Sequence, residues 1–532
     1  MLIDVSTHSF VKKRKSRSVV LSIAGSDSAA MAGIQMDSRC CESFDVHCAT
    51  AITAVTAQNS DEFIALNPID PCDLKEQIQA ALKLKPQSIK IGLVAACEQV
   101  HVIAECIKNY LENNVTTVVY DPVMSATSGA HFFNTPLLNT IRSYLLPLCK
   151  VVTPNIPEAE QLSGLKISNK KQLVLAAKAI RAMSIENLII KGGHIEEAMS
   201  EDFFFLNETV FSLSGERIIT ENTRGTGCAF SSFIAASLAL GYELRDACVL
   251  AKMAMQGAVA NSVSLEHMKS CVSPLGFPKA FWPKFNNAPY DNVGESCSIF
   301  DAEVKTINDL SSSINFLFPS CIETEGPLGL YPIVDSVAWL ERLLPLGITT
   351  VQLRNKELVG RDLEDEVEIA VKLCESYNCR LFVNDHWQLA IDKGAYGVHL
   401  GQEDLLYADL RAIKQSGLRL GVSNHCHFEF ARALAIKPSY LACGPIFATN
   451  TKDMPWVPHG LDGLKYWKEA LGEVPLVAIG GIDGSNIDEV AATGVSGVAL
   501  ISAITSCESP EEKTIDLLRI VNKHNFTIEA NN

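Results

Sequence analysis

Short apolar runs alternate with amphipathic stretches along most of the 532 residues of this chain. In the first half, the apolar runs have the length of strands buried on both faces, which predicts a largely parallel sheet covered by helices. Alternating apolar residues over 201–219 predict a hairpin around Asn207. The other predicted strands are 19–25, 51–58, 88–94, 116–123, 150–155 and 187–193, and the predicted helices are 71–84, 97–113, 170–184, 227–240 and 243–264. Together they predict a three-layer α/β sandwich.

Eight further apolar runs lie between residues 329 and 504, and each is followed by a helix-like stretch. Polar motifs stand at the ends of these runs, as is typical of a (β/α)8 TIM barrel, whose active site is built from the C-terminal ends of its strands. The motifs are QLRNK (352–356), ND (384–385), HLGQED (399–404), GVSNH (421–425), GPIFATNTK (444–452), AIGGI (478–482) and LISAI (500–504). The second half is therefore predicted to be a barrel enzyme.

The segment between the two halves is rich in Pro, Asn and Ser, which favour turns and extended backbone. We therefore expect a basic tail over 1–17, a first domain over 18–268, a linker over 269–326 and the barrel over 327–523. The linker is expected to hold a short helix around 301–310. The tail is interpreted as a solvated segment, with a targeting or nuclear role as the alternative.

Composition narrows the class of function. A net charge of −16 argues against general binding of nucleic acids or acidic membranes. No apolar run is long enough to cross a bilayer. The 17 cysteines are scattered without a CxxC pair, which favours buried small hydrophobes and a cytoplasmic protein. His425 and His427 offer an alternative zinc site, but the sequence supplies no third and fourth ligand nearby.

The sharpest motif of the first domain is TRGTGCAFSS, which opens a long apolar helix. Gly225 and Gly227 would place free backbone N–H groups and the positive helix end at one point, suited to a phosphoryl group. Cys228 at the helix start is expected to have a lowered thiol pKa and to act as a base toward a substrate hydroxyl. The alternative is a glycine turn before a core helix, with Cys228 as packing.

Other strand ends of this domain carry GSD (25–27), DPVM (121–124), TPN (153–155) and KGGH (191–194). Several polar groups at one sheet edge resemble a nucleotide and Mg²⁺ site at the crevice of an open α/β sheet. With AGIQMD, ITAVTAQN and TRGTGC, these motifs make residues 18–268 resemble the hydroxymethylpyrimidine and phosphomethylpyrimidine kinases of thiamine synthesis, in the ribokinase superfamily.

That resemblance implies a ribokinase-like fold and the kinase substrates hydroxymethylpyrimidine, its phosphate and ATP. It implies that Gly25, Asp37 and Gln58 bind the pyrimidine and that Cys228 lies near the accepting hydroxyl. It also implies that Asn155, Glu158 and Lys191 bind ATP and Mg²⁺. One departure is the turn at 28–31, which reads SAAM where the family has a glycine-rich segment. Cβ atoms are therefore expected where glycines would allow either positive φ or a close approach of the ligand.

In the barrel, Gln352, Arg354 and Lys356 alternate along the predicted second strand and are expected to point to the same side. Asp385 and Asp404 end the next two strands and suit an Mg²⁺ ion carried by a diphosphate. The remaining candidate site residues fall into three groups. Asn384 and Gln402 are neutral contacts, and Thr449, Thr451 and Lys452 lie on the loop after strand six. The usual phosphate site of such barrels would be formed by Gly480, Gly481, Ile501 and Ser502.

The motifs QLR-K, ND, GVHLGQED, GVS, GP-F-T-TK and AIGGI make residues 327–505 resemble thiamine-phosphate synthase. The resemblance implies joining of hydroxymethylpyrimidine diphosphate to thiazole phosphate, with early departure of diphosphate and capture of the pyrimidine cation. It implies that Arg354, Lys356 and Lys452, with Mg²⁺, stabilise the departing charge. The implied substrate contacts are Gln352 and Asn384 for the pyrimidine or its diphosphate, and Gly481 and Ser502 for the thiazole phosphate. Ser423 is a further candidate for substrate binding.

The sequence therefore predicts a bifunctional enzyme whose kinase feeds its synthase, acting on small molecules and forming a homo-oligomer by resemblance alone. Two alternatives stay open for the first domain. It is either a pyrimidine-binding module that has lost catalysis, as the altered 28–31 turn suggests, or a kinase for pyridoxal-type substrates.

Overall fold

The computed structural model describes residues 16–124, 134–193, 199–207, 209–266, 269–287, 317–322, 326–449 and 457–529. The described residues form two compact units, one over 16–287 and the other over 317–529. Among them, no helix is long and apolar enough to span a membrane.

The first unit is built on a ten-stranded sheet in the order β10-β9-β8-β7-β6-β5-β4-β1-β2-β3. The central strands β2, β1, β4, β5, β6 and β7 run parallel, and β3, β8, β9 and β10 add antiparallel pairings at the two ends. Their bounds are β1 (Val19–Asp27), β2 (His47–Gln58), β3 (Phe63–Pro68), β4 (Ser88–Ile91), β5 (Thr117–Tyr120), β6 (Val151–Val152), β7 (Asn187–Ile190), β8 (Met199–Leu206), β9 (Thr209–Glu216) and β10 (Lys284–Asn287).

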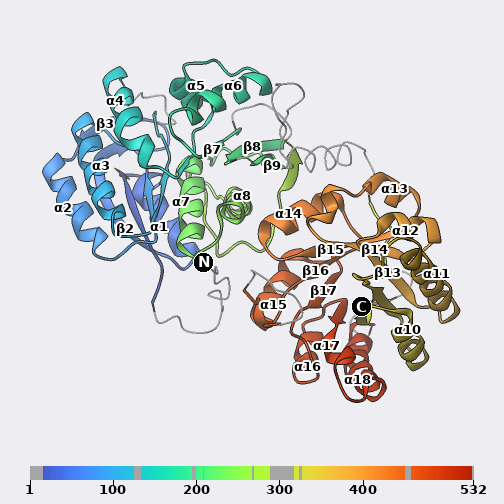
Figure 1. Ribbon diagram of the computed structural model, residues 1–532. Coiled ribbons are helices and arrows are strands. Elements are labelled where there is room, and N and C mark those ends of the chain that lie inside the picture. The colour runs from blue at the N-terminus through green and yellow to red at the C-terminus, as the bar shows by residue number, and fades with distance from the viewer. Residues whose placement is uncertain are drawn as a thin grey trace. The chain divides into compact units, whose positions relative to one another are not determined.

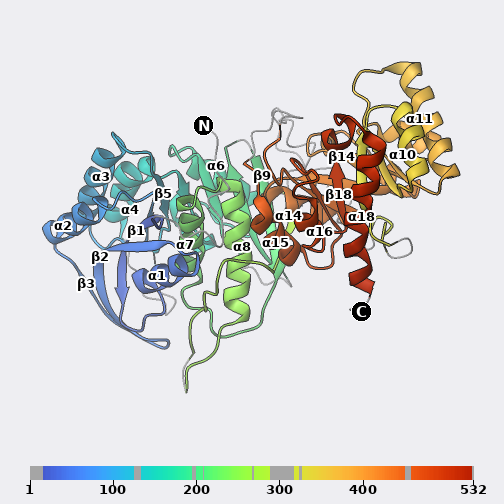
Figure 2. The ribbon, with the colours of Figure 1, turned by 90° about the horizontal axis from the view of Figure 1, so that it is seen from below.

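Helices cover both faces of this sheet (Figures 1 and 2). On one face, the helices α2 to α6 bury their apolar stripes against alternate strand residues such as Leu21 and Ile89. On the other face lie α1, α7 and α8. The bounds are α1 (Gly33–Ser43), α2 (Pro71–Leu82), α3 (Cys97–Leu111), α4 (Thr135–Thr140), α5 (Ile156–Ser163), α6 (Lys170–Arg181), α7 (Thr226–Ala239) and α8 (Leu244–Ala260). The predicted three-layer sandwich is confirmed.

The second unit is a closed barrel of eight parallel strands, in sequence order from β11 to β18. Its strands are β11 (Gly329–Val334), β12 (Thr350–Leu353), β13 (Arg380–Asn384), β14 (Gly397–Leu400), β15 (Arg419–Asn424), β16 (Tyr440–Cys443), β17 (Leu476–Ile479) and β18 (Gly497–Leu500). The helices around it are α10 (Val337–Leu343), α11 (Gly360–Ser376), α12 (Trp387–Lys393), α13 (Leu410–Gln415), α14 (His427–Ile436), α15 (Gly460–Leu471), α16 (Ile487–Ala491), α17 (Ser502–Thr505) and α18 (Pro510–Glu529). The predicted TIM barrel is confirmed.

The segment predicted as a linker contributes to both units. Residues 284–287 form β10, which pairs with β9 at the end of the sheet. Phe318 donates a backbone hydrogen bond to Lys437, and the Cys321 carbonyl accepts one from Arg380, so 317–322 packs on the barrel. The short helix expected at 301–310 lies outside the described residues.

One predicted strand is shorter than expected. β12 ends at Leu353, because the Asn355 side chain accepts from the backbone N–H groups of Glu357 and Leu358 at 2.9 and 2.8 Å and turns the chain. Arg354 and Lys356 therefore lie just beyond the strand and do not alternate along it. In addition, the edge strand β3 was not predicted from the sequence.

Candidate active sites

The start of α7 is the centre of the first site. Gly225 precedes the helix with a φ of 76°, a left-handed conformation that favours glycine, and it packs against the Met31 carbonyl. A Cβ on Gly227 would lie 3.2 Å from Lys191 Nζ. The first turn of α7 therefore combines the backbone N–H groups of a helix N-terminus with a neighbouring ammonium group, which together attract an anion.

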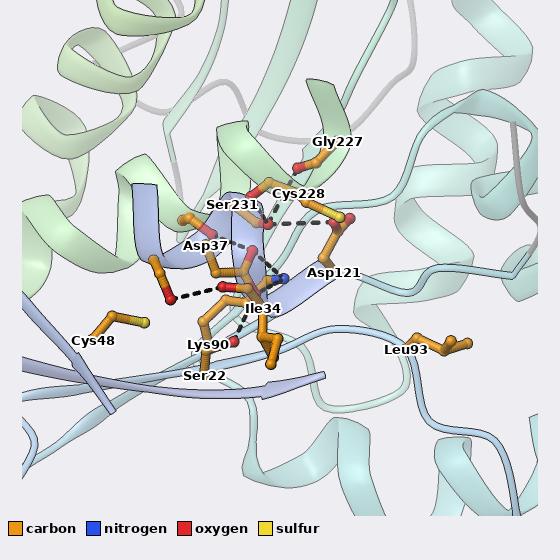
Figure 3. A network of polar contacts seen from close by, with 12 residues as sticks. Ser22, Ile34, Asp37, Cys48, Lys90, Leu93, Asp121, Gly227, Cys228 and Ser231 are labelled. Atoms are coloured by element: carbon orange, nitrogen blue, oxygen red, sulfur yellow. Dashed lines mark hydrogen bonds and ion pairs between the residues drawn. The ribbon is translucent and has the colours of Figure 1, made fainter. Parts of the chain in front are cut away.

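Lys191 forms an ion pair with Asp121, whose Oδ1 lies 2.7 Å from Nζ. Asp121 follows β5 and Lys191 follows β7, the two strands on either side of β6. Ser231 on α7 donates to Asp121 Oδ2 at 3.3 Å, which links this pair to the helix (Figure 3). The Asp121 carboxylate is 1 % exposed and thus needs these partners.

Asn155 and Glu158 form a capping box at the start of α5, each side chain accepting from the other residue's backbone N–H. Burial raises the pKa of Glu158 to about 7, aided by the nearby Asp121 and opposed by Lys191. Asn155, Glu158 and Lys191, which are predicted to serve ATP and Mg²⁺, lie together at the strand ends, with Asn155 and Lys191 bridged through their backbones.

A second buried ion pair lies between the sheet and α7. Lys90 on β4 is 2.9 Å from both Asp37 oxygens, and neither side chain is more than 1 % exposed. Asp37 also accepts from Ser22 at 2.6 Å and from Ser232 at 2.8 Å (Figure 3). Burial by itself lowers the pKa of Lys90, but Asp37, together with the nearby Cys228 and Asp121, outweighs that effect and raises the pKa.

Asp37 holds α1 against its neighbours in this domain. Its two oxygens accept hydrogen bonds from Ser22, Lys90 and Ser232, which ties α1 to β1, β4 and α7. Its contact with a pyrimidine stays a prediction. Of the other residues predicted to bind the pyrimidine, Gly25 lies at a β-bulge of β1 and Gln58 at the end of β2.

Gln58 is held by residues from another part of the domain. Its Oε1 accepts from Arg224 Nη2 at 2.8 Å, and its Nε2 donates to Thr56 at 3.0 Å. The turn at 28–31, which differs from the glycine-rich segment of the family, is held by Asp27. Its two carboxylate oxygens accept hydrogen bonds from the Ala29 and Met31 N–H groups at 3.0 Å. Ala30 in this turn has a φ of 56°, so the substitution of glycine does place a Cβ in left-handed backbone.

The lowered thiol pKa predicted for Cys228 is wrong. Burial raises the pKa of Cys228 to about 11; Lys90 opposes this rise, and the Asp37 and Asp121 carboxylates add to it. The helix start by itself favours a thiolate, but two buried carboxylates on neighbouring elements disfavour a third negative charge.

The mouth of the barrel gathers charged residues from three strands. Asp385, which follows β13 with a φ of 63°, lies beside Asp404 after β14. Burial and the Asp404 carboxylate raise the pKa of Asp385, while Lys356 and Arg354 oppose that rise. Asp404 Oδ2 also accepts from the Gly401 N–H at 3.1 Å. In the part of the chain that the structure describes, no group of three or more His, Cys, Asp or Glu could hold a metal.

Neutral residues line the interior next to these charges. Gln352 and Asn384 are buried on β12 and β13, and Ser423 on β15 is half-buried. His399 Nε2 lies 2.8 Å from Ser423 Oγ, and Gln402 donates to the Ser423 carbonyl at 2.6 Å. Burial, with the nearby Arg354, lowers the pKa of His399 to about 4, so its ring is neutral at pH 7.

The glycine pair after β17 allows two loops to approach closely. Gly480 and Gly481 have φ of 97° and 66°, and a Cβ on Gly481 would lie 2.5 Å from the Ala448 carbonyl oxygen. Ile501 precedes the short helix α17, which Ser502 begins. Thr449 is described on the loop after β16, whereas Thr451 and Lys452 lie outside the described residues.

Comparison with known proteins connects both sites. The family model for phosphomethylpyrimidine kinase matches residues 27–273, and that for thiamine monophosphate synthase matches residues 330–504. The thiamine biosynthetic bifunctional enzyme of Arabidopsis thaliana, named as chloroplastic, is 33 % identical over 491 residues, which cover 91 % of this chain and 89 % of the plant protein. The chain belongs to this family of bifunctional thiamine biosynthetic enzymes.

The thiamine-phosphate synthase of Proteus mirabilis is 56 % identical over 198 residues, covering 37 % of this chain and 92 % of the bacterial enzyme. Among solved structures, the pyridoxal kinase of Staphylococcus aureus in complex with AMP-PCP and pyridoxal matches with a TM-score of 0.45 at 30 % identity, covering 48 % of this chain and 93 % of that one. Because the two family models match residues 27–273 and 330–504, the first unit is the kinase domain of the bifunctional enzyme and the barrel is its synthase domain.

Three residues at the kinase site were not chosen from the sequence. Asp121 stood in the DPVM motif as a strand-end carboxylate without an assigned role. Lys90 stood in the KIG motif, but its burial against Asp37 depends on contact between residues 53 positions apart. Arg224 directly precedes the glycine turn, and nothing local indicates that it reaches Gln58.

Proposed function

We propose that the kinase domain transfers phosphoryl groups from ATP to hydroxymethylpyrimidine and then to its monophosphate. The synthase barrel joins the resulting diphosphate to thiazole phosphate, giving thiamine phosphate and diphosphate. The observation that carries this proposal is the charge at the barrel mouth. Asp385 and Asp404 lie together, next to Arg354 and Lys356, as a site for a Mg²⁺ diphosphate requires.

In the kinase, the first turn of α7 would receive the phosphoryl group in transfer. Gly225 and Gly227 let the backbone approach the anion, and Lys191 neutralises charge beside it. Asn155 and Glu158 would serve ATP and its Mg²⁺ at the same strand ends. Gly25 and Gln58 would contact the pyrimidine, with Arg224 orienting the Gln58 amide.

Cys228 is a thiol at neutral pH in this state, so its action as a base requires loss of a proton with a pKa of about 11. A base acts only when deprotonated, and the thiolate fraction rises about tenfold per pH unit below that pKa. Kinase kcat/KM should therefore rise between pH 7 and 9 in the natural protein. The Cys228→Ala variant should be slower and lose that rise, while its synthase rate stays normal. A parallel rise in the variant would remove Cys228 from the role of base.

In the barrel, the donor set fits Mg²⁺, because two carboxylates supply hard oxygen ligands and the substrate diphosphate supplies the others. A bound Mg²⁺ would neutralise part of the diphosphate charge. Arg354 and Lys356, with Lys452 from the loop after β16, would hold the diphosphate and stabilise it as it departs. Gln352, Asn384 and Gln402 would orient the pyrimidine diphosphate.

The thiazole phosphate would bind on the other side of the mouth. The backbone of Gly481 and the start of α17 at Ile501 and Ser502 correspond to the usual phosphate site of β/α barrels. Thr449 and Thr451 would close over the diphosphate from the loop after β16.

Two rival functions of the first domain are separable by one assay. The full chain is given ATP, Mg²⁺ and either hydroxymethylpyrimidine or pyridoxal, and ATP consumption is followed. Faster turnover of hydroxymethylpyrimidine supports the proposal. Faster turnover of pyridoxal supports a pyridoxal-type kinase, and binding of hydroxymethylpyrimidine without turnover supports a domain that has lost catalysis.

The cytoplasmic location and homo-oligomeric state remain predictions. All described cysteines are free, as a reducing compartment favours. Fractionation of cells and light scattering of the purified chain test the two predictions separately.

A further inference from the structure

A continuous series of hydrogen bonds crosses the interior of the barrel below its mouth. Tyr331 on β11 and Tyr440 on β16 belong to strands that are not neighbours, yet their hydroxyl oxygens lie 2.9 Å apart. Gln352 Nε2 lies 3.4 Å from Tyr331 OH. At the other end, Tyr440 OH lies 2.7 Å from His399 Nδ1, and His399 Nε2 lies 2.8 Å from Ser423 Oγ. We call these five residues the barrel relay.

We assign the relay the direction in which His399 Nδ1 accepts. Tyr440 then donates to His399 Nδ1, so the proton between the two tyrosines comes from Tyr331, which also accepts from the Gln352 amide nitrogen. A neutral imidazole with an accepting Nδ1 carries its proton on Nε2, so His399 donates to Ser423 Oγ. The Ser423 hydroxyl proton is not used by the relay, and Ser423 is the half-buried member at the mouth.

The barrel is shaped around these hydroxyl groups. Tyr331 and Tyr440 are at most 1 % exposed and lie in an apolar cluster with Phe382, whose ring meets that of Tyr440 at 5.2 Å and 88°. A Cβ on Gly421 would overlap the Tyr440 ring. A phenylalanine would fill this space without a buried hydroxyl group. Two tyrosines with fully paired hydroxyls are therefore a costly choice unless the polar connection has a use.

We propose that Tyr440 and His399 are positioning residues of the synthase, which hold Ser423 Oγ as a hydrogen-bond donor toward an acceptor atom of the bound pyrimidine diphosphate. This inference rests on the proposed synthase function. Neither residue touches the substrate in this role; both act through Ser423. Gln402 supports the same end of the relay by its bond to the Ser423 carbonyl.

The test is a double-mutant cycle on synthase turnover, with pyrimidine diphosphate and thiazole phosphate supplied to the full chain. Tyr440→Phe removes the bond to His399 and should lower kcat about tenfold, with a smaller change in KM for the pyrimidine diphosphate. In a Ser423→Ala background, the same substitution should lower kcat less than about twofold, because the group it positions is already absent.

Tyr466→Phe is the matched control. Tyr466 OH also lies 2.7 Å from a buried imidazole, that of His427, in the same domain. Its loss should reduce stability about as much as Tyr440→Phe while leaving kcat within about twofold. His399→Gln, which keeps an amide donor near Ser423, should retain more activity than His399→Asn, and it replaces Tyr440→Phe if that variant fails to fold.

Equal losses from Tyr440→Phe in the natural and Ser423→Ala backgrounds would show a structural role and overturn the proposal. So would normal turnover of Tyr440→Phe. A natural chain that forms no thiamine phosphate from the supplied substrates would instead refute the proposed function.

Discussion

In the kinase domain, each buried lysine at the site has a carboxylate partner in the same domain, whereas at the barrel mouth the charges are grouped by sign. Lys90 pairs with Asp37 and Lys191 with Asp121, at 2.9 and 2.7 Å. In the barrel, Asp385 and Asp404 lie together. Within the described residues, Arg354 and Lys356 form no ion pair.

The difference shows what each site does without ligand. Buried ion pairs add little net stability, but a partner that loses its counter-charge is costly, so the kinase charges fix the positions of α1, α7 and the strand ends. The barrel charges are more exposed and become neutralised only by a ligand that carries both a cation and an anion. Substitutions should therefore affect mainly folding in the first site and mainly turnover in the second.

The largest expected effect comes from Lys90→Met. It leaves the Asp37 carboxylate buried without its cation, and we expect a loss of about 3–5 kcal/mol of kinase-domain stability. Removing both charges in Lys90→Met/Asp37→Leu should recover most of that loss. Denaturant unfolding of the kinase transition measures both, with synthase activity as the control. If Lys90→Met were as stable as the natural protein, the buried ion pair would not hold the kinase site together, and the contrast between the two sites would be wrong.

Arg354→Met should reduce turnover in the barrel rather than stability. We expect synthase kcat to fall about 10²–10³-fold, because a group that stabilises the charge of the departing diphosphate is lost. Stability should change by less than about 0.5 kcal/mol. Arg361→Met, at a side chain 90 % exposed on α11, is the control and should change neither quantity. A large stability loss without a kinetic one would contradict the assignment.

Glu158→Gln sharpens the comparison through pH. The pKa of Glu158 is raised to about 7 in the folded protein, so the stability that its protonated form provides is present at low pH and is lost as pH rises toward 7. Glutamine keeps the capping box without the charge. The variant should match the natural protein at pH 4 and exceed it by about 1–3 kcal/mol at pH 8.

Thermal unfolding at the two pH values measures this effect, and ATP turnover should fall in the same variant. An advantage of the variant at pH 4 rather than pH 8 would show that the carboxyl group is not destabilised by burial.

The smallest expected effect is at the 28–31 turn. Ala30 has a φ of 56°, so Ala30→Gly should relieve left-handed strain of about 1 kcal/mol, partly offset by the greater freedom of glycine in the unfolded chain. We expect a net gain of about 0.5 kcal/mol or less, whereas Ala29→Gly, at a residue without positive φ, should lose stability. The melting temperatures of the two variants measure this difference. Equal losses of stability in both variants would show that Ala30 is not strained.

The sequence predicted both folds because apolar runs, their spacing and their strand-end motifs are local features. The eight barrel strands and the hairpin around Asn207 follow directly from them. The short strands β3 and β10 were missed because they are edge strands with few buried residues. The prediction continued β12 past Leu353 because polar residues alternate there. The turn that ends the strand depends on hydrogen bonds to the Asn355 side chain, which the alternation of residues does not show.

The candidate sites were predictable where one segment supplies several polar groups, as in 352–356 or 225–228. Roles that depend on distant segments were not. Asp37 faces Lys90 across the domain. Burial of Cys228, with two carboxylates from other elements nearby, reverses the pKa shift expected for its thiol. Likewise, Tyr331 and Tyr440 read as ordinary core residues of apolar strands, and only the closed barrel brings their hydroxyl groups together.

The central claim is that one chain carries two separate active sites, the first making the substrate of the second. Complementation tests it most directly: Cys228→Ala and Arg354→Met chains are assayed alone and mixed, with hydroxymethylpyrimidine, ATP, Mg²⁺ and thiazole phosphate. Each variant alone should form thiamine phosphate slowly, and the mixture should form it at a substantial fraction of the natural rate. A mixture no faster than either variant, although each keeps its other half-reaction, would contradict the account.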